Sequence, residues 1–255
     1  MSLTEAFALT AAAFAAGMMN AVAGGGTLIT FPVLILFGMP PVIANATSTL
    51  ALVLGTSGSI YGYRSHLAGV REWLPVFVPV SLAGGFLGSL LLTRGSPAVF
   101  SSLVPYLILF ATFLFMIQGV VRRFAMRSAE TCPSGRGLIP VLVFQFLVSL
   151  YGGYFGAGIG ILMLASLGFM GFSDIHRMNT LKNVLGSLIN LVAALWFTLC
   201  GLIDWPRMAV MTLGAVAGYY AGARFSLGLP QRSVRILISA IGLTITAVMF
   251  WKLGR

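Results

Sequence analysis

Charged residues are scarce in this sequence, and acidic residues are scarcer than basic ones. Only 8% of the 255 residues are charged, five residues are Asp or Glu, and 58% are hydrophobic. The mean hydropathy is +1.00, and soluble domains carry about 25% charged residues. This composition excludes an ordinary soluble domain and indicates an integral membrane protein.

Further absences narrow the function. The two cysteines, Cys132 and Cys200, provide neither a disulfide framework nor a metal-ligand cluster, so we expect no metal and no cofactor. The apolar stretches hold no constellation of His, Asp and Glu for catalysis, which argues against an enzyme. No P-loop pattern occurs, and the acidic residues fall in loops or at predicted span ends, so neither ATP hydrolysis nor a carboxylate relay is visible. Because no basic residue precedes Arg64, the first apolar run lacks the charged segment of a cleavable signal peptide, and we expect it to remain in the mature protein.

The sequence contains instead a series of long, continuous apolar runs, which predict membrane-spanning helices and not the alternating segments of a membrane barrel. Five runs precede a basic polar segment at 122–137, and five follow it. The second run of each five is short, since Leu28 to Met39 would reach ~18 Å as a helix, against a hydrocarbon thickness of ~30 Å. The runs are Leu3–Val22, Leu28–Met39, Val42–Tyr63, Trp73–Thr93, Val99–Val121, Leu138–Phe155, Ile161–Phe172, Met178–Gly201, Met208–Phe225 and Val234–Trp251.

The two halves of the chain resemble each other. A shift of 134 residues lays Gly26 on Gly160 and Asn45 on Asn179. With five elements in each half, the second copy enters the membrane from the opposite side, as in the inverted repeats common among secondary transporters. We therefore predict an all-α integral membrane fold of about 8 to 10 transmembrane elements. It comprises a first repeat at 1–121, a basic cytoplasmic linker at 122–137 and a second repeat at 138–255.

Basic residues predict the orientation. If the 122–137 segment is cytoplasmic, ten Arg residues fall on the cytoplasmic side and four basic residues fall outside, with Lys182 within a span. This bias follows the positive-inside rule, so both termini should be non-cytoplasmic in a multi-pass protein of the plasma (inner) membrane. The charges are scattered over loops, which indicates attraction to membrane lipids and argues against a nucleic-acid partner.

A glycine-rich break precedes each short run, at Gly24-Gly25-Gly26 and at Gly158 to Gly160. If each short helix begins near mid-membrane, its N-terminus presents N–H groups and a partial positive charge, and glycines let a ligand approach. Thr27 is placed to add a hydroxyl. The alternative is tight helix packing by small residues. Packing is the favoured interpretation for the small-xxx-small positions Gly84, Gly88, Gly218 and Gly222.

The third element of each half adds polar groups that share a helix face. These are Asn45, Ser48 and Thr49 in the first half and Asn179, Lys182 and Asn183 in the second. Lys182 lies ~12 Å into its helix, where an ionisable group suggests a function. Interhelical hydrogen bonding is the alternative for the uncharged residues, and snorkelling to the surface is the alternative for Lys182. His176 and Arg177 are candidate gate residues, with an interfacial ion pair to Asp174 as the alternative.

These motifs resemble the sulfite exporter TauE/SafE family of membrane transporters. The resemblance rests on the repeated glycine-rich hairpin, Phe31-Pro32-Val33-Leu34, Ala44-Asn45-Ala46-Thr47-Ser48-Thr49, the run Gly152 to Gly160, and Asp174 to Asn179. It implies export of small sulfur-containing or organic anions, such as sulfite, sulfoacetate or thiosulfate. The chain departs from symmetry in two places, since the second hairpin lacks three consecutive glycines and Ser166 stands at the position of Pro32.

The sequence thus predicts an anion exporter that works by alternating access around a midplane site, and an anion channel on the same repeats is the alternative. The identity of the anion, the coupling ion and a homodimeric state are left open. The predicted substrate-binding residues are Gly24, Gly25, Gly26, Thr27, Asn45, Ser48, Thr49, Gly158, Gly160, Asn179, Lys182 and Asn183.

Overall fold

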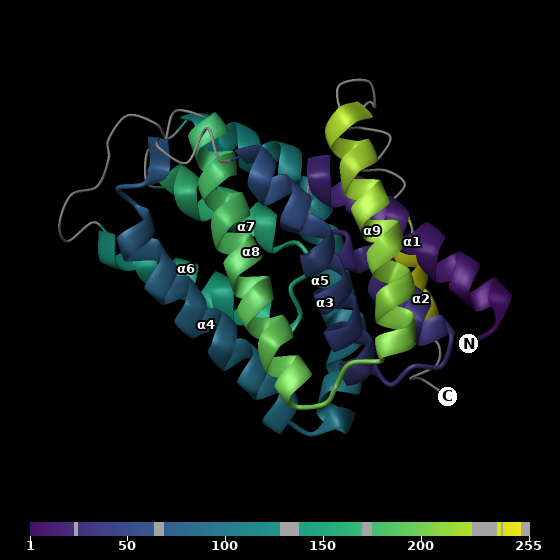
Figure 1. Ribbon diagram of the computed structural model, residues 1–255. Coiled ribbons are helices and arrows are strands. Elements are labelled where there is room, and N and C mark those ends of the chain that lie inside the picture. The colour runs from purple at the N-terminus through teal and green to yellow at the C-terminus, as the bar shows by residue number, and fades with distance from the viewer. Residues whose placement is uncertain are drawn as a thin grey trace.

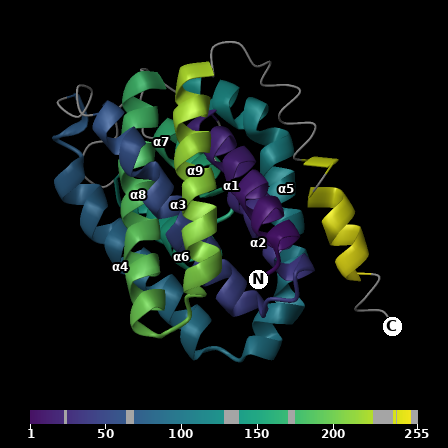
Figure 2. The ribbon, with the colours of Figure 1, turned by 45° about the vertical axis from the view of Figure 1, so that its right-hand side comes forward.

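The computed structural model describes residues 1–22, 25–63, 69–127, 138–169, 175–225, 239–240 and 242–250, and these residues are helical with no strand (Figure 1). The labelled helices are α1 (Leu3–Val22), α2 (Thr27–Leu36), α3 (Pro41–Tyr63), α4 (Leu74–Arg94), α5 (Pro97–Arg127), α6 (Leu138–Tyr154), α7 (Ile159–Phe169), α8 (Ile175–Leu199) and α9 (Trp205–Phe225). Residues 242–250 form a further helical stretch that lies beside α5 (Figure 2), where Phe250 and Tyr106 pack edge to face.

The observed helices follow the predicted apolar runs closely. The second helix of each half is short, with 10 residues in α2 and 11 in α7. Helix α2 ends earlier than its apolar run, and Gly38 after it takes a φ of +79°, which closes the helix through hydrogen bonds from its own N–H and that of Met39. One boundary differs more. Helix α5 continues to Arg127, so the first residues of the predicted linker at 122–137 are helical.

Among the described helices, the most extensive contacts are those of α1 with α9 and of α4 with α6. Glycines allow both contacts. A methyl group at Gly88 of α4 would overlap the carbonyl oxygen of Leu150, and one at Gly218 of α9 would overlap that of Phe14. The predicted packing role of Gly84, Gly88, Gly218 and Gly222 is therefore confirmed, because a side chain at any of them would meet the partner helix.

Helices α3 and α8 pack together between these pairs and run antiparallel (Figure 1). Near the start of α3, the Thr47 hydroxyl accepts a hydrogen bond of 3.1 Å from the backbone N–H of Asp204, which follows α8. Near the start of α8, the guanidinium of Arg177 lies beside Gly69, which follows α3. The polar residues of α3 and α8 therefore lie on two central helices of opposite direction.

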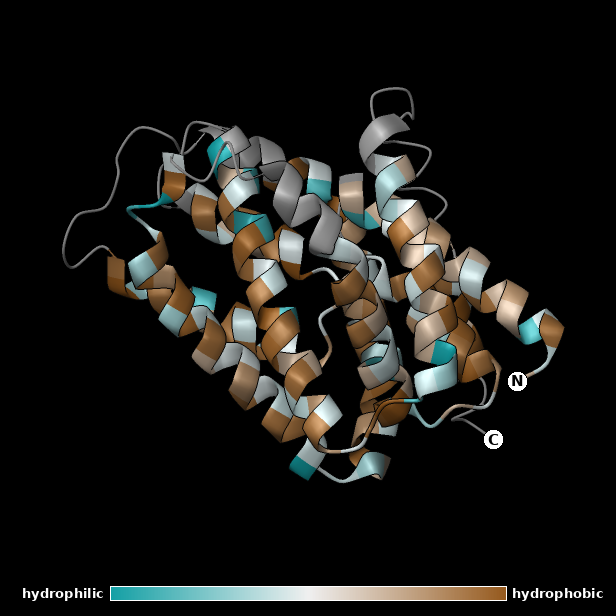
Figure 3. Ribbon diagram, in the orientation of Figure 1, coloured by the Kyte–Doolittle hydropathy of each residue, from teal (hydrophilic) through white to brown (hydrophobic). Residues whose placement is uncertain are grey.

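The outside of the bundle is apolar (Figure 3). In the described part of the chain, three helices are long and apolar enough to cross a membrane: Leu74–Arg94, Pro97–Val121 and Arg177–Leu199. Large hydrophobic side chains such as Phe113, Leu213 and Leu199 are exposed on the helix surfaces. Exposed apolar area on this scale suits a lipid environment, as the composition predicts.

Candidate functional site

The first hairpin break joins α1 to α2 at Gly25 and Gly26. Gly25 has a φ of +95°, which L side chains rarely adopt, and a Cβ there would lie 2.6 Å from the ring of Phe115. The N–H of Gly26 donates to Oδ1 of Asn20 at 2.6 Å. A side chain of α1 thus binds the N–H that precedes α2, and the N–H groups of Leu28 and Ile29 bond to the carbonyls of Gly25 and Gly26, whereas the sequence suggested that the N–H groups at this end would be unpaired.

Two buried hydroxyls extend this arrangement into α3. The hydroxyl oxygens of Thr30 and Ser48 are 2.6 Å apart, and Thr30 also donates to the carbonyl oxygen of Gly26 at 3.2 Å. Either hydroxyl can be the donor in the bond between Thr30 and Ser48. Both side chains are fully buried. Ser48, a predicted site residue, therefore lies against the first turn of the short helix of its own half.

The second hairpin break joins α6 to α7 through two glycines with positive φ, Gly156 at +80° and Gly158 at +79°. The N–H of Ile161 donates to the Gly158 carbonyl at 3.0 Å, and the Tyr151 hydroxyl donates to the Ala157 carbonyl at 2.8 Å. A Cβ at Gly156 would lie 3.5 Å from Oδ1 of Asn190 in α8. This break is shaped by left-handed glycines and by side chains of its own half.

Lys182 lies beside the first turn of α7. A Cβ at Gly160 would lie 3.6 Å from the Cδ of Lys182, so the aliphatic part of the side chain covers the glycine. Its ammonium reaches one turn back along α8 and donates to Oδ1 of Asn179 at 3.3 Å. Three predicted site residues, Gly160, Asn179 and Lys182, are therefore brought together, and Lys182 is half-buried.

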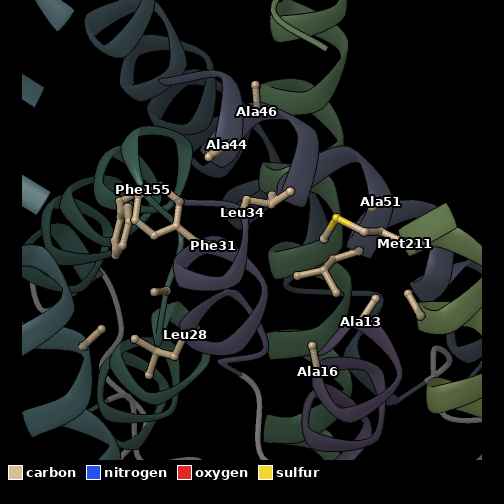
Figure 4. Packing of buried hydrophobic residues seen from close by; sticks show 14 of the residues in the cluster. Ala13, Ala16, Leu28, Phe31, Leu34, Ala44, Ala46, Ala51, Phe155 and Met211 are labelled. Atoms are coloured by element: carbon tan, nitrogen blue, oxygen red, sulfur yellow. The ribbon is translucent and has the colours of Figure 1, made fainter. Parts of the chain in front are cut away.

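Asn45 connects the first half to the break in the second. Its Nδ2 donates to the carbonyl oxygen of Tyr154, the last residue of α6, at 3.2 Å. Next to this bond, the rings of Phe31 and Phe155 meet edge to face with centroids 5.3 Å apart (Figure 4). Asn45 is 1% exposed, and its Oδ1 has no hydrogen-bond partner among the described residues. Helices α2 and α3 of the first half therefore contact the break of the second half through an aromatic pair and one amide.

The other predicted residues are more dispersed. Thr27 is the first residue of α2, and the Thr49 hydroxyl donates to the Asn45 carbonyl at 2.8 Å. Asn183 is half-buried in α8. Arg177 is exposed at the start of α8 beside Gly69. Gly24 and the side chain of the other gate candidate, His176, lie outside the described residues.

Comparison with known proteins now adds to this geometry. The sequence profile of the sulfite exporter TauE/SafE family matches residues 9–249. The chain belongs to this family. It is 31% identical over 247 residues to a probable membrane transporter protein of Haemophilus influenzae, which covers 94% of this chain and 92% of the relative.

Two further relatives carry the same kind of description. A probable membrane transporter protein ORF9 from Sinorhizobium sp. is 27% identical, with 93% of this chain and 89% of the relative covered. The probable membrane transporter protein YfcA of Escherichia coli K12 is 26% identical, with 94% and 87% covered. No solved structure matches the chain. The predicted resemblance is confirmed, and the family match includes both halves.

The sequence reasoning missed four residues at the breaks. Asn20 accepts from the Gly26 N–H, Thr30 donates to the Gly26 carbonyl, Tyr154 accepts from Asn45, and Tyr151 donates into the second break. Asn20 had a detectable signal, because it is a strongly polar residue in the last turn of an apolar helix. The role of Tyr154 depends on its backbone carbonyl, which no side-chain pattern reveals.

A charged cluster closes the end of the α1–α9 pair. Arg207 donates to Glu5 at 2.6 Å and to Asp204 at 2.5 Å. Hydrogen bonds to Glu5 and then to Asp204 raise the pKa of Arg207 above its ordinary value, so this guanidinium stays positive. Two of the acidic residues therefore serve an ion-pair cluster that joins α1 to α9.

Proposed function

We propose that this protein is a secondary transporter that exports a small sulfur-containing or organic anion, of the sulfite, sulfoacetate or thiosulfate type. The anion binds between two inverted five-element repeats, and alternating access exposes the site to each side in turn. Membership of the TauE/SafE family and the description of the relatives as probable membrane transporters support transport. The geometry of the two hairpin breaks supports an anion as the substrate.

The helix contacts support the inverted repeat. Exchanging the halves turns α1 into α6 and α4 into α9, so the α1–α9 pair becomes the α6–α4 pair. These two pairs make the most extensive contacts among the described helices. The antiparallel packing of α3 with α8 fits the same two-fold relation, because the exchange turns one into the other. An axis between α3 and α8 accounts for all three contacts.

One observation carries the anion proposal. Ser48 and Lys182, which the 134-residue shift makes equivalent, each lie against the first turn of the short helix of their own half. Helix N-termini attract anions through their N–H groups and their partial positive charge of about +0.5. The ammonium of Lys182 adds a full charge at one of these ends. An ionisable group within a membrane span is costly, and an anionic substrate offsets that cost.

Transport into proteoliposomes tests the proposal. Radiolabelled sulfite, thiosulfate and sulfoacetate are offered to vesicles that hold the same unlabelled anion, and a carrier should accelerate uptake by counterflow. Lys182→Ala should strongly reduce this uptake at low anion concentration. Arg94→Ala is the matched control, because it removes one exposed positive charge from the end of α4 and should leave transport intact. Uptake without counterflow would support the channel alternative, and no uptake of any of the three anions would refute the proposed substrate class.

The predicted gate and orientation stay part of this proposal. Arg177 lies at the end of the bundle that also holds the start of α4 and the end of α3. If the basic segment at 122–137 is cytoplasmic, that end is the cytoplasmic entrance. A reporter fused at the N-terminus should then be accessible from the periplasmic side of the plasma membrane, and protection of that reporter would refute the orientation.

A further inference from the structure

The oxygen atom Oδ1 of Asn45 is the starting point for a second binding site. Asn45 is 1% exposed, and within the described part of the chain nothing donates a hydrogen bond to this oxygen. Its amide orientation is well defined, because Nδ2 donates to the Tyr154 carbonyl and an oxygen in that place would repel it. A buried amide oxygen with no donor is unfavourable, and it indicates a ligand that brings positive charge or a proton donor.

The equivalent asparagine in the second half has a positively charged partner for its side-chain oxygen. Asn179 corresponds to Asn45, and its Oδ1 accepts from the ammonium of Lys182, three residues further along α8. In the first half that position is Ser48, an uncharged residue whose hydroxyl is hydrogen-bonded to Thr30. One asparagine is therefore paired with a covalently attached cation, and its counterpart is not.

The surroundings of Asn45 favour a cation. The Tyr154 carbonyl that Asn45 binds belongs to the C-terminal end of α6, where a helix carries partial negative charge. Ser48 lies three residues after Asn45 and so shares its face of α3, and its hydroxyl and that of Thr30, 2.6 Å apart, keep acceptor lone pairs for a cation. All these oxygen atoms are uncharged. Divalent cations usually require carboxylate ligands, so these oxygens suit a monovalent cation. None of them titrates near neutral pH, which excludes a proton as the bound species.

We propose that a monovalent alkali cation, of the Na⁺ class, binds at Asn45 Oδ1 as the exchangeable counterpart of the Lys182 ammonium. Asn45 supplies the main oxygen, and the hydroxyl oxygens of Ser48 and Thr30 are the further ligands. The bound cation bridges α3 to the second hairpin, because Asn45 also holds the Tyr154 carbonyl. Its role as the coupling ion rests on the proposed transport function, whereas its binding does not.

Thermal unfolding of the purified protein tests binding directly. Titration with NaCl should raise the Tm in a saturable way, and choline chloride at equal ionic strength should not. Asn45→Ala should lose this Na⁺-specific increase. Gln145→Leu is the matched control, since Gln145 is likewise a buried amide with a partnerless oxygen, but lies between α4 and α6, and it should keep the increase. Equal shifts with NaCl and choline chloride in the parent protein would overturn the proposal, whatever the variants do.

A second variant tests the equivalence with Lys182. Ser48→Lys should supply the cation covalently and remove the Na⁺ effect on the Tm. Binding of ²²Na⁺ by the unmodified protein, displaced by unlabelled Na⁺ but not by choline, is the measurement that needs no variant. Sodium binding without any anion transport would leave this site standing and refute the proposed function. Anion transport with no ²²Na⁺ binding would overturn the site and leave the proposed function standing.

Discussion

The two short helices occupy equivalent places in their halves and yet begin differently. At α2, neutral groups hold the first turn, with Asn20 on the Gly26 N–H and Thr30 and Ser48 beside it. At α7, Lys182 covers Gly160, and the break itself contains two glycines with positive φ. The second half thus places the charge of Lys182 at its short helix, and the first half places a network of uncharged groups there.

The largest difference should appear when the break glycines are replaced. Gly25→Ala combines a positive φ with overlap on Phe115, whereas a Cβ at Gly158 lies 3.6 Å from its nearest neighbour, Leu114. The backbone alone should cost about 1–3 kcal/mol at either site, and overpacking should add about 1–3 kcal/mol at Gly25. Thermal unfolding in detergent should therefore show a Tm decrease for Gly25→Ala about twice that for Gly158→Ala. Equal decreases would mean that Phe115 moves aside at little cost.

The two halves should also differ in how much each contributes to substrate affinity. Lys182→Ala should weaken anion binding about 10- to 100-fold, because hydrogen bonds to charged groups contribute about 1.5–3 kcal/mol. Ser48→Ala should weaken it about 2- to 10-fold, as expected for a neutral bond of about 0.5–1.5 kcal/mol. The concentration dependence of proteoliposome uptake measures both. A larger loss from Ser48→Ala would reverse the division of charge between the halves.

The hydrogen bond that closes the first break should have an intermediate effect on stability. Asn20→Ala leaves the Gly26 N–H without its acceptor, which resembles loss of a helix cap and should cost about 0.5–2 kcal/mol. Asn190→Ala, next to Gly156 in the second break, should cost less, because Asn190 lies beside that glycine without a comparable bond to its N–H. Chemical denaturation of both variants gives the comparison. A more stable Asn20→Ala protein would show that the bond strains the hairpin.

The smallest effect is expected for Arg177, at the proposed cytoplasmic entrance. Arg177→Ala should slow maximal transport about two- to fivefold, because interactions of exposed charges contribute ~0–1 kcal/mol. The KM should stay unchanged, since Arg177 contacts the region of Gly69 and is distant in sequence from both breaks. Initial rates over a range of substrate concentrations separate the two parameters. A changed KM with an unchanged maximal rate would assign Arg177 to binding.

The helices were predictable because hydrophobicity and glycine both mark them in sequence. The first apolar run, Leu3 to Val22, coincides with α1, since it is continuous and a glycine run follows it. The extension of α5 to Arg127 was not predictable, because its last residues are basic and hydropathy does not distinguish a polar helix from a loop. Periodicity and composition report local environment, and they identify spans better than helix ends.

The site residues were predictable as types but not as partners. Asn45, Ser48 and Lys182 are polar residues in apolar surroundings, and this contrast is visible in one sequence. The Asn45 bond to Tyr154 joins residues 109 positions apart, and only the packed chain brings them together. Asn20 was not predicted as a site residue, because it lies in the helix before the glycine run. Long-range pairing is set by the tertiary fold, and it determines what each polar group can bind.

The glycine contacts between helices also determine which parts of the molecule can move as units. At Gly218 and Gly88, a backbone carbonyl of the partner helix occupies the space of a side chain, so neither pair can slide without a clash. Each of these locked pairs takes one helix from each half of the sequence. A hinge motion at the boundary between the halves would have to break the helix contacts within both pairs. In the proposed transport cycle, α1 with α9 and α4 with α6 should therefore move as rigid bodies, each built from both halves of the sequence.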